Sequence, residues 1–221
     1  MSIRRQLDGW IGRFPSLPYI APFLLFLVLT TLQARLPGGI GLGYPLKTIV
    51  VGAFLFALRP WFPKMELRAV GTAIAVGVFV WVIWILPEGL YPLLGESEPF
   101  DPFAHFTGGG AFVWIAFRLL GATVVVAITE ELFWRGFLIR WIIKPDFRSV
   151  AIGTFTWPSF LLTSILFATE HNRWLVGFIA GVIYNILLYR TKSLSACIVA
   201  HGMTNLALGL YVLATQQWTF W

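Results

Sequence analysis

The stretch LLGATVVVAITEELFWRGFLI, residues 119–139, lies between Arg118 and Arg140 and is long enough to cross a lipid bilayer once. It is apolar except near its middle, where three ionisable residues occur: Glu130, Glu131 and Arg135. An ionisable side chain at the centre of a bilayer costs about 2.5–3.5 kcal/mol to insert, and such residues usually serve a function. The stretch therefore predicts a transmembrane helix that carries a buried polar site.

The composition of the whole chain favours the same class of protein. Hydrophobic residues make up 58% of the 221 positions and charged residues only 12%, whereas soluble domains contain roughly 25% charged residues. Spans of about 20 residues, with their connections, allow roughly six to eight crossings in this length. No room remains for a sizeable soluble domain. The single cysteine, Cys197, excludes an intrachain disulfide and a thiolate metal cluster.

Apolar windows predict an all-α bundle of about seven transmembrane helices, forming a single transmembrane domain over residues 1–221. The windows are 17–33, 44–58, 69–87, 119–139, 152–171, 174–189 and 194–214. The first window follows three arginines, as in a signal peptide, but no small-residue cleavage pattern follows it, so we expect an uncleaved span. Segment 88–110 is rich in proline and glycine, which excludes a continuous helix and predicts a loop on the outer face.

The basic residues are distributed unequally between the two sets of loops. One set holds most of the 16 Lys and Arg residues: Arg4, Arg5, Arg13, Arg59, Lys64, Arg68, Arg140, Lys144, Arg148, Arg190 and Lys192. The opposite set holds only Arg35, Lys47 and Arg173. The positive-inside rule then predicts a cytoplasmic amino terminus. The net charge of +6 reflects topology and not a nucleic-acid partner. A bacterial cytoplasmic (inner) membrane suits this chain, as would an endoplasmic reticulum membrane.

The charged cluster of the fourth window suggests two roles. Glu131 and Arg135 are four residues apart, so they share one helix face and can neutralise each other. Glu130 is rotated by about 100° from Glu131 and is free to face another helix as a general base. The alternative interpretation is that all three side chains only join helices.

Two later segments add polar groups. His201 and Asn205 lie on one face of the last window, and His201 is about 13 Å past Lys192, at the same depth as the glutamates. They could form a site or simply join helices by hydrogen bonds. His171 is typical of a histidine at a helix end, and a straight fifth span places it near the outer surface, away from Glu130.

The order Glu-Glu-x-x-x-Arg, Phe-x-x-x-His and His-x-x-x-Asn resembles the CAAX prenyl protease and bacteriocin-processing (CPBP, or Abi) family of intramembrane proteases, over about residues 119–210. The resemblance implies a site within the bilayer and cleavage of a peptide bond in a membrane-associated or lipidated substrate. It assigns the general base to Glu130, a water-positioning role to His171, and oxyanion stabilisation to His201 and Asn205. Glu131 and Arg135 match supporting positions.

The metal requirement has two interpretations. Glu130, His171 and His201 could bind zinc, with the other glutamate as base. We favour catalysis without a cofactor, because a Glu/His pair and a His/Asn pair account for every polar group and no His-Glu-x-x-His pattern occurs. The expected partners are a protein or peptide substrate, with or without a prenyl group, and the lipid bilayer. A non-catalytic binding or immunity protein and a proton-coupled transporter are the rival functions.

Overall fold

The computed structural model describes residues 3–95 and 99–221, and it is helical without any strand in that part of the chain. Residues 96–98 of the predicted outer loop lie outside the described residues. Among the described residues, five helices are long and apolar enough to cross a membrane: Leu17–Arg35, Gly39–Trp61, Gly110–Ile143, Trp174–Thr191 and Leu194–Thr215. Two shorter apolar helices, Val70–Ile85 and Trp157–Thr169, complete the bundle. The prediction of an all-α, multi-pass membrane protein is confirmed.

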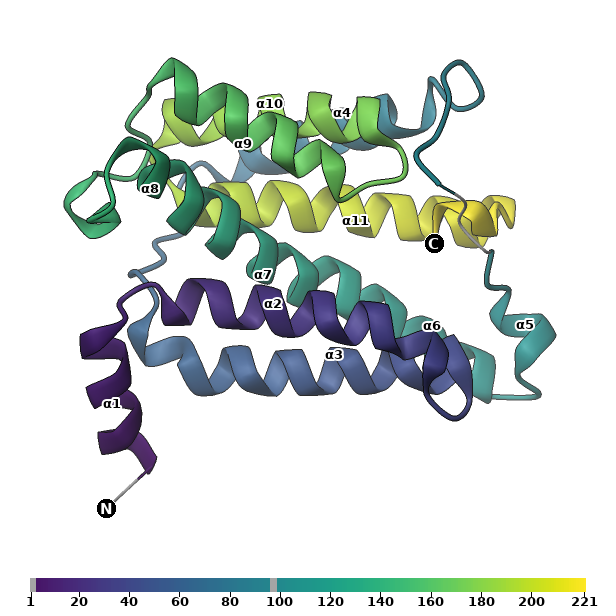
Figure 1. The fold of residues 1–221 in the computed structure, drawn as a ribbon. Coiled ribbons are helices and arrows are strands. Elements are labelled where there is room, and N and C mark those ends of the chain that lie inside the picture. The colour runs from purple at the N-terminus through teal and green to yellow at the C-terminus, as the bar shows by residue number, and fades with distance from the viewer. Residues whose placement is uncertain (1–2, 96–98) are drawn as a thin grey trace.

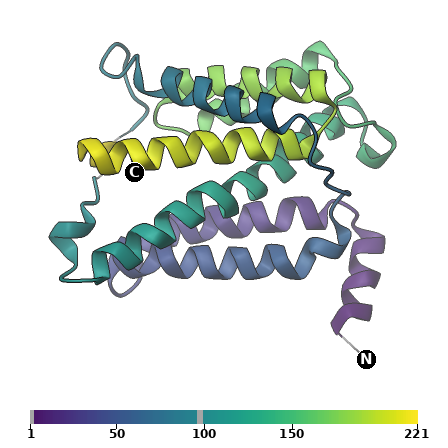
Figure 2. The same ribbon diagram turned by 180° about the vertical axis from the view of Figure 1, so that it is seen from behind.

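The helices form three layers (Figures 1 and 2). On one side lie α2 (Leu17–Leu32) and α3 (Gly39–Leu58), and on the other lie α4 (Val70–Ile85), α9 (Trp157–Thr169) and α10 (Trp174–Thr191). Between them, α11 (Leu194–Thr215) crosses the long helix 110–143. That helix comprises α6 (Gly110–Leu120), a π-helical segment Gly121–Val126, α7 (Ala127–Glu131), a second π-helical segment Leu132–Leu138, and α8 (Ile139–Ile143).

The loops meet at two ends of the bundle. At the end nearer the amino terminus, which we call the basic end, Arg148 donates to the carbonyl of Pro15 and Lys192 donates to that of Gly153. The amphipathic helix α1 (Ile3–Arg13) also lies at this end (Figure 1). At the opposite end, Arg173 pairs with Glu88. The predicted gathering of basic loops on one face is therefore present in the fold.

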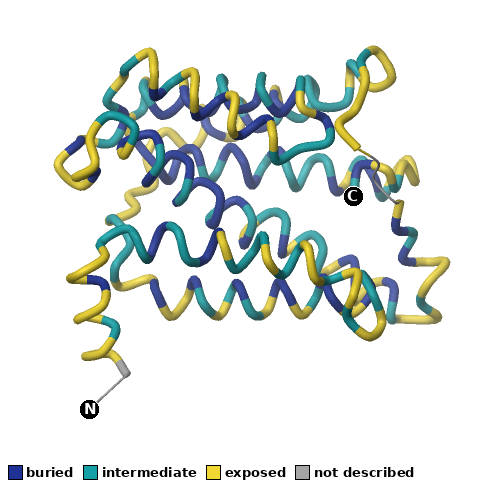
Figure 3. The backbone as a smooth tube through the Cα atoms, viewed as in Figure 1, coloured by how far each residue is buried: buried dark blue, intermediate teal, exposed yellow. Residues whose placement is uncertain are grey.

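Burial follows the layers. Buried residues concentrate where α7, α9, α10 and α11 meet, while the outer faces of α2 and α3 are largely exposed (Figure 3). The exposed residues on these faces are apolar, for example Leu24, Val28, Ile49 and Phe56. A protein surface of this kind is suited to contact with lipid.

Glycines set the closest helix contacts. A Cβ on Gly202 of α11 would lie 2.6 Å from the carbonyl oxygen of Thr123 in the first π-helical segment. A Cβ on Gly181 of α10 would lie 3.3 Å from Ser164 of α9. Small residues at such positions let membrane helices approach each other closely. The position of one helix then constrains the side chains of the helix beside it.

Three boundary predictions were wrong. The fifth span was expected at 152–171, but α9 covers only Trp157–Thr169. The helix starts late because Gly153 has a positive φ of 77° and the Thr156 hydroxyl caps the first turn by accepting a hydrogen bond from the backbone N–H of Ser159. The fourth span is much longer than 119–139. Lys47, which was assigned to an outer loop, lies within α3 and is only 5% exposed, because this helix begins at Gly39.

Candidate active site

One cavity of about 340 Å³ lies between helix 110–143 and α11. It is within the size range of small-molecule and substrate pockets. The loop between α9 and α10 and the segment 219–221 also line it. All four residues predicted to be catalytic border this cavity: Glu130, His171, His201 and Asn205. Residues that are up to 75 positions apart along the chain are thus brought to one cavity.

The backbone of helix 110–143 determines how Glu130 reaches the cavity. Positions 118, 122, 126 and 130 all line it. In a regular α-helix, residues four apart drift by about 40° per step, so the row would turn away from a single cavity. The π-helical segment Gly121–Val126 takes up roughly one more residue per turn and compensates for this drift. π-Helical turns of this kind are frequent at functional sites.

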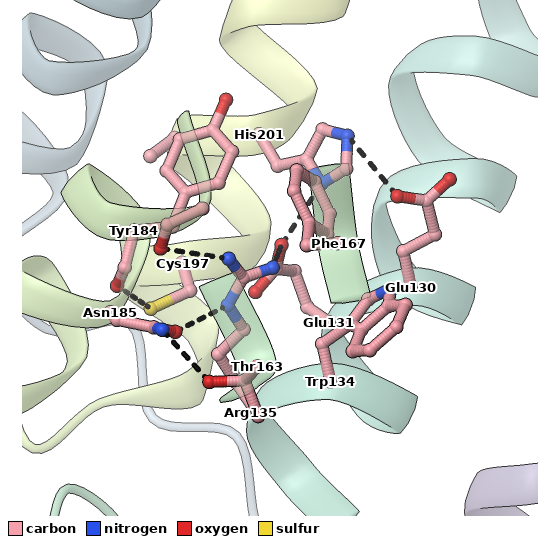
Figure 4. A network of polar contacts seen from close by, with 12 residues as sticks. Glu130, Glu131, Trp134, Arg135, Thr163, Phe167, Tyr184, Asn185, Cys197 and His201 are labelled. Carbon is pink, nitrogen blue, oxygen red and sulfur yellow. Dashed lines mark hydrogen bonds and ion pairs between the residues drawn. The ribbon is translucent and has the colours of Figure 1, made fainter. Parts of the chain in front are cut away.

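His201 lies between the two glutamates (Figure 4). Its Nδ1 is 2.9 Å from Oε1 of Glu131, and its Nε2 is 4.0 Å from Oε2 of Glu130. An ionised carboxylate only accepts, so Nδ1–H donates to Glu131 and Nε2 is directed toward Glu130. The other side of the ring is fixed by Tyr184, whose ring stacks on His201 with centroids 5.3 Å apart.

The two glutamates have different surroundings. Glu131 is fully buried and accepts a hydrogen bond from Arg135 at 3.0 Å, in addition to that from His201. Oε2 of Glu130 is buried and makes no hydrogen bond with the described residues. Oε2 of Glu131 likewise has no hydrogen-bond partner among the described residues, but its Oε1 is engaged and Glu131 does not line the cavity, whereas Glu130 does. The predicted Glu131–Arg135 pair is present.

Arg135 connects three parts of the bundle. It is 1% exposed, and its guanidinium donates to Glu131, to the side-chain oxygen of Asn185 and to the carbonyl of Gly181. It also lies 4.5 Å from the ring centre of Phe167 on α9. A guanidinium with this many partners positions helix 110–143 relative to α9 and α10.

His171 lies just past the end of α9 and borders the cavity, unlike the placement that a straight fifth span would give. Because α9 ends at Thr169, the chain turns there and the imidazole borders the cavity. Its Nδ1 donates to the carbonyl of Phe167 at 2.9 Å, which leaves Nε2 as the nitrogen with a free lone pair in the neutral ring. The ring of Trp84 contacts it edge-on, with centroids 5.2 Å apart.

Asn205 lies one turn after His201 on α11. Its Nδ2 donates to the carbonyl of Ala122 in the first π-helical segment, at 2.8 Å. A side-chain amide has two N–H donors, so one is engaged in orienting the group and a second is free for another acceptor. His201 and Asn205 therefore present two donor groups to the same cavity.

Sequence reasoning missed several lining residues. Glu170 accepts a hydrogen bond from Nε1 of Trp134 at 2.9 Å and borders the cavity. Its place directly before His171 was the available signal. Asn185 is fully buried and joins helices through Thr163 and Ser164, which settles its role as structural. Cys197 is fully buried and is not among the cavity-lining residues.

The donor set was also compared with the requirements of a metal ion. Within residues 3–95 and 99–221, no three His, Cys, Asp or Glu side chains come together as a possible metal site. In particular, Nδ1 of His201 and Nδ1 of His171 are both engaged with protein acceptors. Any zinc ion would therefore have to use the two Nε2 atoms together with Glu130.

Comparison with known proteins identifies one relationship. Residues 112–207 match the family model described as type II CAAX prenyl endopeptidase Rce1-like. The match includes the glutamate pair, both histidines and Asn205, and it begins close to the start of helix 110–143. No curated protein and no solved structure matches the chain.

Proposed function

We propose that the chain is a glutamate-type endopeptidase that cleaves membrane-associated or lipidated substrates, and the match of residues 112–207 to the Rce1-like family model supports this proposal. The observation that carries the proposal is the position of Glu130. Its carboxylate has a buried, unused oxygen on a cavity in a hydrophobic bundle, 4.0 Å from His201 Nε2.

In the proposed reaction, a water molecule is the nucleophile. A water about 2.8 Å from both Glu130 Oε2 and His201 Nε2 satisfies both groups, because these atoms are too far apart to bond directly. Glu130 accepts a proton from the water as its oxygen attacks the scissile carbonyl carbon. The same proton then passes to the leaving amine as the C–N bond breaks. Nε2 of His171, in the same cavity, accepts the second water hydrogen and orients the nucleophile.

The oxyanion requires donors that are fixed before the reaction. His201 and Asn205 supply them in this proposal. Glu131 holds the His201 ring, and the carbonyl of Ala122 holds the Asn205 amide. His201 donates from Nε2 when both ring nitrogens carry a hydrogen, and the free N–H of Asn205 is the second donor in the same cavity.

The decisive experiment uses the purified chain in nanodiscs with a fluorogenic peptide that ends in a farnesylated C-a-a-X sequence. Glu130→Gln keeps the shape and removes the base, so we expect turnover to fall by about 10²–10⁴-fold. Glu66→Gln, which removes an exposed carboxylate, is the matched control and should retain full activity. Wild-type binding of the peptide without any cleavage would instead identify a non-catalytic binding protein.

The same assay tests the cofactor. We propose that no metal takes part, so treatment with a chelator should leave turnover unchanged. Loss of activity on chelation, with recovery on addition of zinc, would contradict the proposal and favour a zinc site made by Glu130, His171 and His201.

We also propose that the basic end faces the cytoplasm of a bacterial cell. The chain suits impermeant thiol labelling, because its one cysteine is fully buried and Cys197→Ser gives a clean background. In intact cells, a cysteine at Thr107, exposed at the opposite end, should react, whereas one at Ser149, exposed at the basic end, should react only after permeabilisation. The reverse pattern would overturn the orientation.

A further inference from the structure

Two arginines border the cavity at the end away from the basic loops, and they differ in their partners. Arg173 forms an ion pair with Glu88 and donates to the carbonyl of Thr219. Arg118 forms no ion pair with any described residue and instead lies against aromatic faces. Its Cζ is 4.6 Å from the ring centre of Tyr44 and 5.8 Å from that of Trp221.

A second cation shares the Tyr44 ring. Nζ of Lys47 lies 4.6 Å from the ring centre of Tyr44 and donates to the Thr30 hydroxyl at 3.1 Å. Lys47 is only 5% exposed, and it has no carboxylate within ion-pairing distance in residues 3–95 and 99–221. Buried charges are normally paired, since an uncompensated charge in an apolar medium is costly. Arg118 and Lys47 are therefore two basic side chains on one aromatic ring, and neither forms an ion pair with a described residue.

Arg118 lies on the same helix as Glu130, at a distance that a short peptide can span. Arg118 and Glu130 are the two ends of the cavity-lining row on helix 110–143. At a rise of 1.5 Å per residue they are about 18 Å apart along the axis, which corresponds to no more than about five residues of extended peptide. A peptide with its scissile bond at Glu130 and His201 thus reaches Arg118 within a few residues.

We infer that Arg118 binds the free α-carboxylate of the substrate, with Tyr44 and Trp221 confining its guanidinium; this assignment rests on the proposed peptidase function. A guanidinium can donate two parallel hydrogen bonds to a carboxylate, which fixes both the distance and the direction of the chain end.

The test is a binding cycle in the Glu130→Gln background, in nanodiscs of phosphatidylcholine. The probes are two fluorescein-labelled farnesylated C-a-a-X peptides that differ only in a terminal carboxylate or carboxamide. With Arg118 present, the carboxylate peptide should bind about 10- to 100-fold more tightly, as expected for hydrogen bonds to a charged group. Arg118→Gln should remove this preference without weakening the carboxamide peptide, and Arg118→Lys should retain part of it.

A matched control is Arg35→Gln, which removes an exposed arginine at the same end and should leave the preference intact. Equal binding of the two peptides to the Glu130→Gln protein, or equal weakening of both by Arg118→Gln, would overturn the assignment. A carboxamide peptide ending in Glu that binds as well as the carboxylate peptide would overturn the α-carboxylate specifically. Arg118-dependent binding of phosphatidylglycerol, with no difference between the peptides, would assign the site to a lipid headgroup.

Turnover in a Glu130-containing protein separates this inference from the function it rests on. Cleavage of both peptides at equal kcat/KM would retain the peptidase and reject the role of Arg118. An Arg118-dependent preference in binding, with no cleavage of either peptide, would retain the carboxylate site and reject the peptidase. Thermal unfolding of Arg118→Gln and Arg118→Lys shows whether the two variants fold equally.

Discussion

Glu131 fixes the orientation of His201: its Oε1 lies 2.9 Å from Nδ1 of the imidazole and also accepts from Arg135. The contact decides which ring nitrogen faces the cavity. It also makes Glu131 the residue through which the site is joined to Arg135 and hence to α10. Its neighbour Glu130 has no such engagement, so adjacent glutamates serve as a positioning group and as the proposed base.

Replacing Glu131 by Gln should harm stability more than replacing Glu130 by Gln. The change leaves Arg135 as a buried cation without its carboxylate, and loss of one partner of a buried ion pair costs about 3–5 kcal/mol. Thermal unfolding in detergent measures the difference. Equal melting temperatures for Glu131→Gln and wild type would show that the pair contributes little to the fold.

The kcat/KM should fall at low pH, because acid protonates Glu130 and removes the base. Stopped assays across the pH range should show this decline in the wild-type protein; a rate that does not change at low pH would assign the base to another group.

Gly202→Ala should reduce both stability and turnover. The added methyl would meet the backbone oxygen of Thr123 at 2.6 Å and force α11 away from helix 110–143 beside His201. Overpacking of this kind costs about 1–3 kcal/mol. Gly71→Ala is the control, because a Cβ at Gly71 in α4 has no atom within 4 Å. Unfolding and turnover that are the same for both variants would show that the contact does not constrain the site.

Tyr184 should contribute to the site through its ring and not through its hydroxyl. Tyr184→Phe loses the hydrogen bond to Thr204, which is 2.7 Å long, but keeps the ring on His201. We expect a cost of about 1 kcal/mol in stability and nearly normal turnover. Tyr184→Ala removes the ring and should lower kcat strongly. A large loss of kcat in Tyr184→Phe would instead implicate the hydroxyl in the reaction.

The parts of the site that the sequence predicts correctly depend on local geometry. Glu131 and Arg135 pair because a helix brings residues four apart together, and His201 reaches the glutamates because residue counts fix depth along a helix. A straight span misplaces His171 because the position of this residue depends on α9 ending at Thr169 and on the turn that leads to α10 at Trp174.

Other features depend on tertiary packing and have little local signal. The hydrogen bond between Trp134 and Glu170 joins segments 36 residues apart, and no periodicity indicates it. Lys47 was counted with the outer loops although it falls within the apolar window 44–58, and the structure places its amine against two aromatic rings, those of Tyr44 and Phe26. The two π-helical segments are backbone adjustments to packing, and the apolar sequence GATVVV is equally suited to an α-helix.

The first of those segments has a consequence for how such a chain can change. If residues 121–126 took up regular α-helical winding at unchanged length, Arg118 would rotate by about 100° relative to Glu130. The two ends of the cavity would then face different directions, although every side chain that borders it had been kept. Substitutions that change the winding of this single turn are therefore a route by which related chains could alter which substrates fit while leaving the hydrolytic residues untouched.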